Sequence, residues 1–184
     1  MSNIKNEAKI KNPIIVKVRE QLEHRAMWLA LLDEEAQARG IDDPNFGRKA
    51  IYKCGRLQGA KFSGGNTSFK TLKKNLFTKA AQWVFEMKIK ECTDDKLSID
   101  FHYCPLVKAW QKMGKSDEEI ARLCDSAMCG DRGIISRFGG KLNLEKVIAK
   151  GDDICEIRFV RDNTIDPNND EPPADVVCNP EYTK

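Results

Sequence analysis

Two residues with catalytic chemistry, His102 and Cys104, lie close together at the end of a predicted β-strand. Alternate side chains of a strand point to the same face, so the sequence predicts that His102 and Cys104 share one. A helix is predicted to follow Pro105, and a thiol at a helix N-terminus has a lowered pKa and is a better nucleophile. A nucleophilic thiol also needs a partner that moves its proton. The pattern therefore predicts Cys104 as nucleophile and His102 as proton-transfer group; the alternative is a thiol that only packs at a corner.

Asp131 is the second candidate. Apolar spacing predicts a helix over residues 116–138, in which Asp131 falls on the apolar side with Cys124. An unpaired carboxylate there is costly, and burial would raise its pKa and suit it to general acid–base catalysis. The alternative is that the helix ends near Gly130 and Asp131 starts a turn. Both interpretations stay open, because Gly130 and Gly133 fit either a break or a close approach to something bound.

The strand predicted over residues 154–161 places Cys155 on a face with Ile157 and Phe159. Arg158 or Arg132 could hold the carboxylate of a substrate through charge-assisted hydrogen bonds. These residues complete a candidate site for a small molecule.

A metal held by Cys104, Cys155 and His102 is an alternative. Structural zinc sites usually contain closely spaced cysteine pairs. Cys124 and Cys129 are the nearest pair, and on a helix they lie about 140° apart, on different faces. The spacing therefore favours a site without metal or cofactor.

The elements that must position these residues predict an α+β fold, with N-terminal helices packed on an antiparallel sheet of two hairpins and a helical pair inserted between the hairpins. Residues 1–162 are predicted to form one domain, with a helical part (12–81) and a part carrying the sheet and inserted helices (82–162). Residues 163–184 are predicted to be an acidic, proline-rich tail that wraps the surface or stays disordered. The predicted helices cover 13–40, 43–61, 67–81, 106–113 and 116–138, and the predicted strands cover 83–90, 97–104, 141–149 and 154–161.

Composition excludes several classes of protein. The 184 residues carry a formal charge of only +3, with no basic stripe, so nucleic acid is not an expected partner. No apolar run is long enough to span a membrane, and the N-terminus has no apolar signal core. Seven cysteines, an odd number, indicate reduced thiols in a cytoplasm. We expect a cytoplasmic protein that acts on a small molecule; a homo-oligomer stays open.

Four short motifs resemble the L-2-amino-thiazoline-4-carboxylic acid hydrolase family, over about residues 80–160. They are Cys104-Pro-Leu-Val-Lys-Ala-Trp-x-x-Met-Gly, Ser116-Asp-Glu-Glu-Ile-Ala-x-Leu-Cys, Gly130-Asp-Arg-Gly and Lys150-Gly-Asp-Asp-x-Cys-Glu-x-Arg-Phe. The resemblance implies a hydrolase that opens the cyclic isothiourea 2-amino-thiazoline-4-carboxylate to N-carbamoyl-cysteine. It maps the family's cysteines to Cys104 and Cys155 and its acidic position to Asp131, with Cys124 as a further member of the site.

The order of helices, hairpins and a late Gly-x-x-x-Cys strand is also similar to the 4-vinyl reductase domain, a small-molecule-binding module. This similarity implies a second possibility, a binding or sensing domain whose cysteines line an apolar pocket without catalysis. Loss of turnover in a folded Cys104→Ser variant would favour the enzyme. An apolar ligand that copurifies, with no turnover, would favour the binding module.

Overall fold

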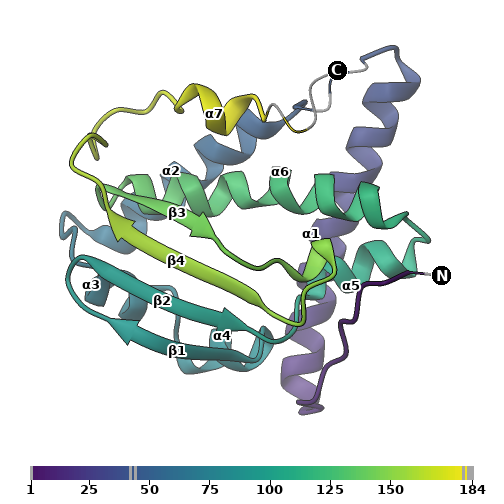
Figure 1. Cartoon of the computed structure of the whole chain (residues 1–184), viewed down its shortest axis with the longest axis horizontal. Coiled ribbons are helices and arrows are strands. Elements are labelled where there is room, and N and C mark those ends of the chain that lie inside the picture. Colours follow the sequence, from purple (N-terminus) through teal and green to yellow (C-terminus); the bar gives the residue numbers. More distant parts are fainter. Residues whose placement is uncertain (1, 42, 44, 180, 182–184) are drawn as a thin grey trace.

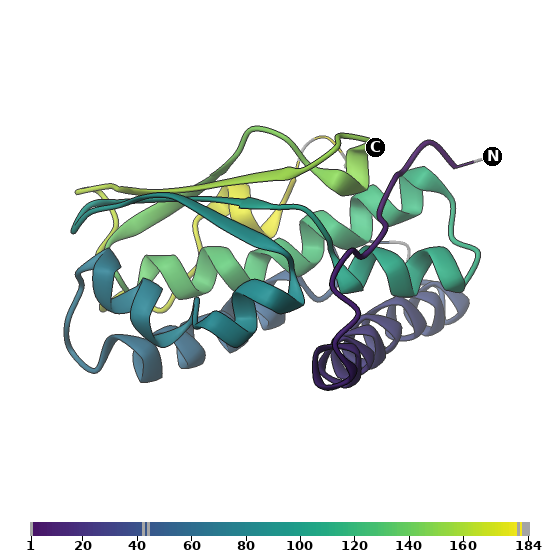
Figure 2. The same ribbon diagram turned by 90° about the horizontal axis from the view of Figure 1, so that it is seen from below.

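The computed structural model describes residues 2–41, 43, 45–179 and 181, and within them the chain has the predicted α+β fold. A four-stranded antiparallel sheet forms one layer, and the helices lie on one side of it (Figure 1; Figure 2). None of the described helices combines the length and the apolar character needed to cross a bilayer.

The sheet contains the two predicted hairpins in the order β1-β2-β4-β3. Its inner face is apolar: in the β2–β4 register Leu97 lies opposite Phe159, Ile99 opposite Ile157, and Phe101 opposite Cys155. The register explains why Cys155 faces the helices although it stands at the end of its strand. The strands are β1 (Met87–Cys92), β2 (Lys96–Phe101), β3 (Gly140–Leu144) and β4 (Cys155–Arg161).

The helices begin and end largely where the sequence has capping residues. Pro13 is the first residue of α1, and Ser116 with Glu119 forms the predicted capping box of α6. The helices are α1 (Pro13–Ala38), α2 (Arg48–Ser63), α3 (Phe69–Asn75), α4 (Lys79–Val84), α5 (Pro105–Lys112), α6 (Asp117–Ser136) and α7 (Ala174–Val177), and η1 (Ile148–Lys150) is a single 3₁₀ turn.

Several predicted boundaries are wrong. The helix predicted over 67–81 is two helices, because Ser68 caps α3 and Thr78 caps α4. β1 therefore starts at Met87 rather than at residue 83, and β3 ends at Leu144 rather than at residue 149. The predicted helix over 43–61 begins only at Arg48, and residue 44 within it lies outside the described residues.

The glycines of α6 mark a close helix contact rather than a break. A Cβ on Gly133 would lie 2.2 Å from the carbonyl oxygen of Tyr52, and one on Gly55 would lie 2.0 Å from that of Gly130. Only glycine allows the backbones of α2 and α6 to approach so closely. α6 continues through these glycines to Ser136, so Asp131 is helical and does not start a turn.

The described residues of the N-terminal and C-terminal segments pack on this framework. In the predicted tail, Asp170 accepts hydrogen bonds from Arg56 of α2, and the carbonyl oxygen of Val176 accepts one from the buried Arg48. The tail thus wraps α2 and α6 over its described part; residues 180 and 182–184 lie outside it. The N-terminal segment runs past α5 and is held at Glu86, whose carboxylate accepts hydrogen bonds from the backbone N–H groups of Lys9 and Ile10.

Candidate functional site

A cavity of about 410 Å³ lies between the helices and the inner face of the sheet. Its walls come from α1, α2, α4, α5, α6 and all four strands or the loops beside them, and most of the lining side chains are apolar. A concave, mainly apolar space with a few polar groups is the usual form of a small-molecule site. The polar and thiol-bearing side chains in its lining are Arg25, Cys54, Gln58, Cys104, Cys124, Asp131 and Cys155.

Asp131 reaches the cavity because α6 turns one apolar face toward it. Cys124, Met128 and Ile134 line the same wall, at helical spacing from Asp131. Burial among apolar groups raises the pKa of Asp131 to about 6, against the opposing effect of the positive charges on Arg25 and Arg132. A carboxyl group with this pKa is ionised at neutral pH yet takes up a proton readily, as a general base requires.

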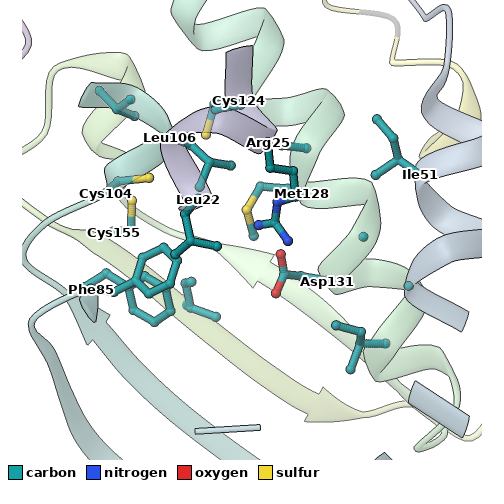
Figure 3. A pocket seen from close by; sticks show the side chains of 18 of the residues that line it. Leu22, Arg25, Ile51, Phe85, Cys104, Leu106, Cys124, Met128, Asp131 and Cys155 are labelled. Carbon is teal, nitrogen blue, oxygen red and sulfur yellow. The ribbon is translucent and has the colours of Figure 1, made fainter. Parts of the chain in front are cut away.

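Arg25 was not predicted as a site residue. It lies on α1 between Leu22 and Leu29, and all three side chains line the cavity. Figure 3 shows the guanidinium group directed toward the Asp131 carboxylate. Among the described residues, no salt bridge involves either side chain, so both charges remain available to a ligand. The helical spacing from Leu22 and Leu29 was the signal in the sequence that could have revealed Arg25.

Cys104, Cys124 and Cys155 line the same cavity, and Figure 3 shows the Cys104 and Cys155 side chains close together on its wall. Burial raises the pKa of all three thiols, to about 12 for Cys155, and the neighbouring thiols raise the pKa of Cys124 and Cys155 further. The prediction that Cys104 has a lowered pKa is therefore wrong. Hydrogen bonds from the backbone N–H groups of Leu106 and Val107 do lower it, but burial has the larger effect.

Asn6 fixes the backbone of Cys104 and was also missed. Its amide nitrogen donates to the Cys104 carbonyl oxygen at 2.8 Å, and its Oδ1 accepts from the Cys104 N–H at 2.9 Å. Asn6 is buried, with 2% of its surface exposed. Nothing in the polar sequence around Asn6 distinguishes this residue, because the pairing joins positions far apart in the chain.

His102 lies apart from the cysteines. β2 ends at Phe101, so the alternation of side chains does not continue to Cys104, which instead caps α5. Phe101 and Cys104 line the cavity, whereas His102 is exposed and is not part of the lining. The prediction that His102 and Cys104 share a face is wrong for this reason.

The two arginines predicted to bind substrate also point elsewhere. Arg158 follows Ile157 on β4 and so lies on the outer face of the sheet, where it forms a salt bridge of 2.9 Å with Asp100. Arg132 follows Asp131 on α6, about 100° further around the helix, and forms a salt bridge of 2.8 Å with Asp125. Neither side chain lines the cavity, and Arg25 occupies the place that was expected for them.

The alternative metal site does not assemble. His102 is exposed and separate from Cys104 and Cys155, which removes a nitrogen ligand from the proposed set. Across the described part of the chain, no cluster of three or more histidine, cysteine or acidic side chains is arranged to hold a metal ion.

Comparison with known proteins identifies a family and a similar fold. A model of the family described as L-2-amino-thiazoline-4-carboxylic acid hydrolase matches residues 19–159, more than half of the chain. No curated protein matches the sequence. Among solved structures, the chain is similar to a trafficking protein particle complex subunit 3 from Naegleria fowleri, covalently bound to palmitic acid. The TM-score is 0.51 and the identity 19%, over 75% of this chain and 93% of that one, so the likeness concerns the fold alone.

Proposed function

The chain belongs to the L-2-amino-thiazoline-4-carboxylic acid hydrolase family, and from this premise we propose that it opens a cyclic amidine that carries a carboxylate. The observation that carries the proposal is the pair of opposite charges, Arg25 and Asp131, at one apolar cavity. A cyclic isothiourea with a carboxylate, such as 2-amino-thiazoline-4-carboxylate, has the complementary charges. Its carboxylate suits Arg25, and its amidinium group suits Asp131.

In the proposed reaction, Asp131 acts as general base. It takes a proton from a water molecule that adds to the amidine carbon, and the carbon–sulfur bond of the ring then breaks. Asp131 returns this proton to the departing sulfur, while the added hydroxyl becomes the carbonyl group of the product and releases its own proton, equivalent to the one that the amidinium carried, to solvent. The product is the ring-opened carbamoyl thiol, and one water molecule has been consumed. The pKa of about 6 allows Asp131 to do both at neutral pH.

We assign Cys104 a place beside the reacting carbon. Because burial raises the pKa of its thiol, Cys104 is protonated at neutral pH and can attack only if its proton moves to Asp131. Asp131 is close enough to Cys104 for its charge to raise the pKa of the thiol. Cys155 and Cys124 complete the sulfur-rich wall. His102, Arg158 and Arg132 have no role in this mechanism because they lie outside the cavity.

The test is to incubate the purified protein with 2-amino-thiazoline-4-carboxylate and to follow N-carbamoyl-cysteine by mass spectrometry. We expect product from the wild type, a loss of about 100-fold or more in Asp131→Asn, and a rate that falls below about pH 6 as Asp131 becomes protonated. Cys104→Ser distinguishes the nucleophiles: loss of turnover indicates attack by the thiol, and retained turnover indicates attack by water.

Matched controls are Glu118→Gln, an exposed carboxylate on the same helix, and Cys178→Ser, an exposed thiol outside the family match. Both should keep wild-type activity. Activity retained by folded Asp131→Asn would contradict the assignment of the base.

The apolar lining supports a second candidate function, a module that binds an apolar ligand without turnover. The protein from Naegleria fowleri with a similar fold is described as covalently bound to palmitic acid, which gives this candidate a precedent in the fold. Native mass spectrometry of the freshly purified protein tests it: a copurified apolar molecule, together with no turnover of any cyclic isothiourea, would place this candidate first.

A further inference from the structure

The cavity is larger than the simplest substrate needs. A cavity of about 150 Å³ accommodates one benzene ring, so 410 Å³ provides room for about 16 non-hydrogen atoms. A five-membered amidine ring with its amino and carboxylate groups has only about nine, so it would leave nearly half of the space unfilled. Apolar wall that a ligand does not cover stays in contact with water, which is unfavourable, so the surplus indicates a larger ligand.

The surplus volume is bounded by an apolar wall. Six apolar side chains line the cavity and belong to, or pack against, the core cluster at the inner face of the sheet: Leu76, Phe77, Met87, Phe101, Leu144 and Ile157. We call this group the apolar chamber. The charges of Arg25 and Asp131 come from α1 and α6, so one ligand can meet charged groups and the apolar chamber at the same time.

Resting on the proposed function, we propose that the natural substrate is an amphiphile, a cyclic amidine carboxylate whose exocyclic nitrogen carries an apolar chain of about six carbon atoms. The carboxylate and the amidinium group lie at Arg25 and Asp131, and the chain fills the apolar chamber. The reaction balances as before. Water adds to the amidine carbon, the carbon–sulfur bond breaks, and the proton held by Asp131 passes to the sulfur. The added hydroxyl becomes the carbonyl group and releases its proton to solvent, which gives an N-alkylcarbamoyl thiol.

Probes whose ring the protein cannot open allow the effect of the alkyl chain on binding to be measured without turnover. The probes are 2-(alkylamino)-imidazoline-4-carboxylates with methyl, butyl, hexyl and octyl chains, in which NH replaces the ring sulfur, and the measurement is isothermal titration calorimetry with the wild type. We expect affinity to rise about fourfold for each added methylene as far as hexyl, and to level off at octyl when the chamber is full. Equal affinity for all four probes would overturn the proposal.

The second test is a substitution that places a larger side chain in the apolar chamber. Ala81 on α4 lines the cavity, whereas its neighbour Ala80 is exposed. Ala81→Phe should remove the gain from the longer chains and keep the affinity of the methyl probe, and the matched control Ala80→Phe should behave as the wild type. Retention of the full chain-length dependence in folded Ala81→Phe would overturn the placement of the chain.

Turnover of 2-(hexylamino)-thiazoline-4-carboxylate, compared with the parent compound, separates this proposal from the proposed function. A higher kcat/KM for the hexyl compound supports both. Chain-dependent binding of the imidazolines without turnover of either thiazoline supports the amphiphile and rejects the hydrolase. Turnover of the parent with no gain from the hexyl chain supports the hydrolase and overturns the amphiphile.

Discussion

Two carboxylates of α6, Asp125 and Asp131, are both largely buried but have opposite environments. Asp125 accepts hydrogen bonds from Arg48, Arg132 and Asn179, and these partners hold its pKa below the ordinary value despite burial. Asp131 lies about 120° further around the helix and faces the cavity. Within the described part of the chain no side chain donates a hydrogen bond to its carboxylate, and burial raises its pKa to about 6. The same helix thus carries two kinds of carboxylate. Asp125 stabilises the fold through salt bridges, whereas the negative charge of Asp131 is neutralised by no salt bridge among the described residues and can take part in chemistry.

The largest change in stability is expected for Asp125, the carboxylate that forms salt bridges. Asp125→Asn should lower the free energy of unfolding by about 3–5 kcal/mol, because it leaves the guanidinium group of Arg48, only 1% exposed, without its counter-charge. Urea denaturation at pH 7 measures this change, with Glu118→Gln as the control that should shift it by less than about 0.5 kcal/mol. Equal stability of Asp125→Asn and the wild type would remove the distinction between the two carboxylates.

Replacement of Asp131 is expected to change the free energy of unfolding in the opposite direction. Asp131→Asn should raise the free energy of unfolding at pH 8 by on the order of 2 kcal/mol, since it removes a charge that the folded cavity disfavours. Because the folded state binds this proton more tightly than the unfolded chain does, the wild type loses stability as the pH rises from about 4 to about 6.

The gain from Asp131→Asn should therefore be absent near pH 4 and complete above pH 6. Urea denaturation of both proteins across this range measures it. A gain that does not vary with pH would show that the amide acts through packing rather than through charge.

The smallest stability effect is expected for Arg25, the cation of the cavity. Arg25→Gln should change the free energy of unfolding by less than about 0.5 kcal/mol, because its side chain is exposed, unlike that of Arg48. It should raise KM for a carboxylate substrate by about 10- to 100-fold, since a charge-assisted hydrogen bond is lost. Arg39→Gln, an exposed arginine at the end of the same helix, is the control and should leave KM unchanged. An unchanged KM in Arg25→Gln would show that the substrate carboxylate does not bind at Arg25.

Local patterns predicted much of this molecule. The capping box at Ser116, the hairpins and the apolar stripe of α6 all follow from periodicity and turn chemistry, and that stripe placed Asp131 and Cys124 together. Prediction failed where the local pattern stopped. The strand was extended past Phe101 to include His102 and Cys104, although the chain there turns into α5.

The remaining parts of the site depend on contacts between distant segments. Arg25 reaches Asp131 only because α1 crosses near α6, and Asn6 reaches Cys104 only because the N-terminal segment passes α5. The pKa of Cys104 was mispredicted for the same reason: the helix terminus is visible in the sequence, but the apolar walls that outweigh it come from other elements.

The glycine contact between α2 and α6 also determines how the cavity can adapt. With Gly55 and Gly133 against the backbone of the opposite helix, these two helices cannot slide or separate without opening gaps along their whole contact. α1 packs instead on α5 and α4, and its side chains form the opposite wall. The wall that carries Asp131 is therefore rigid, and the wall that carries Arg25 is built by a different set of helix contacts. A ligand must therefore bring its reacting carbon to a carboxylate whose position is set by the contact between α2 and α6.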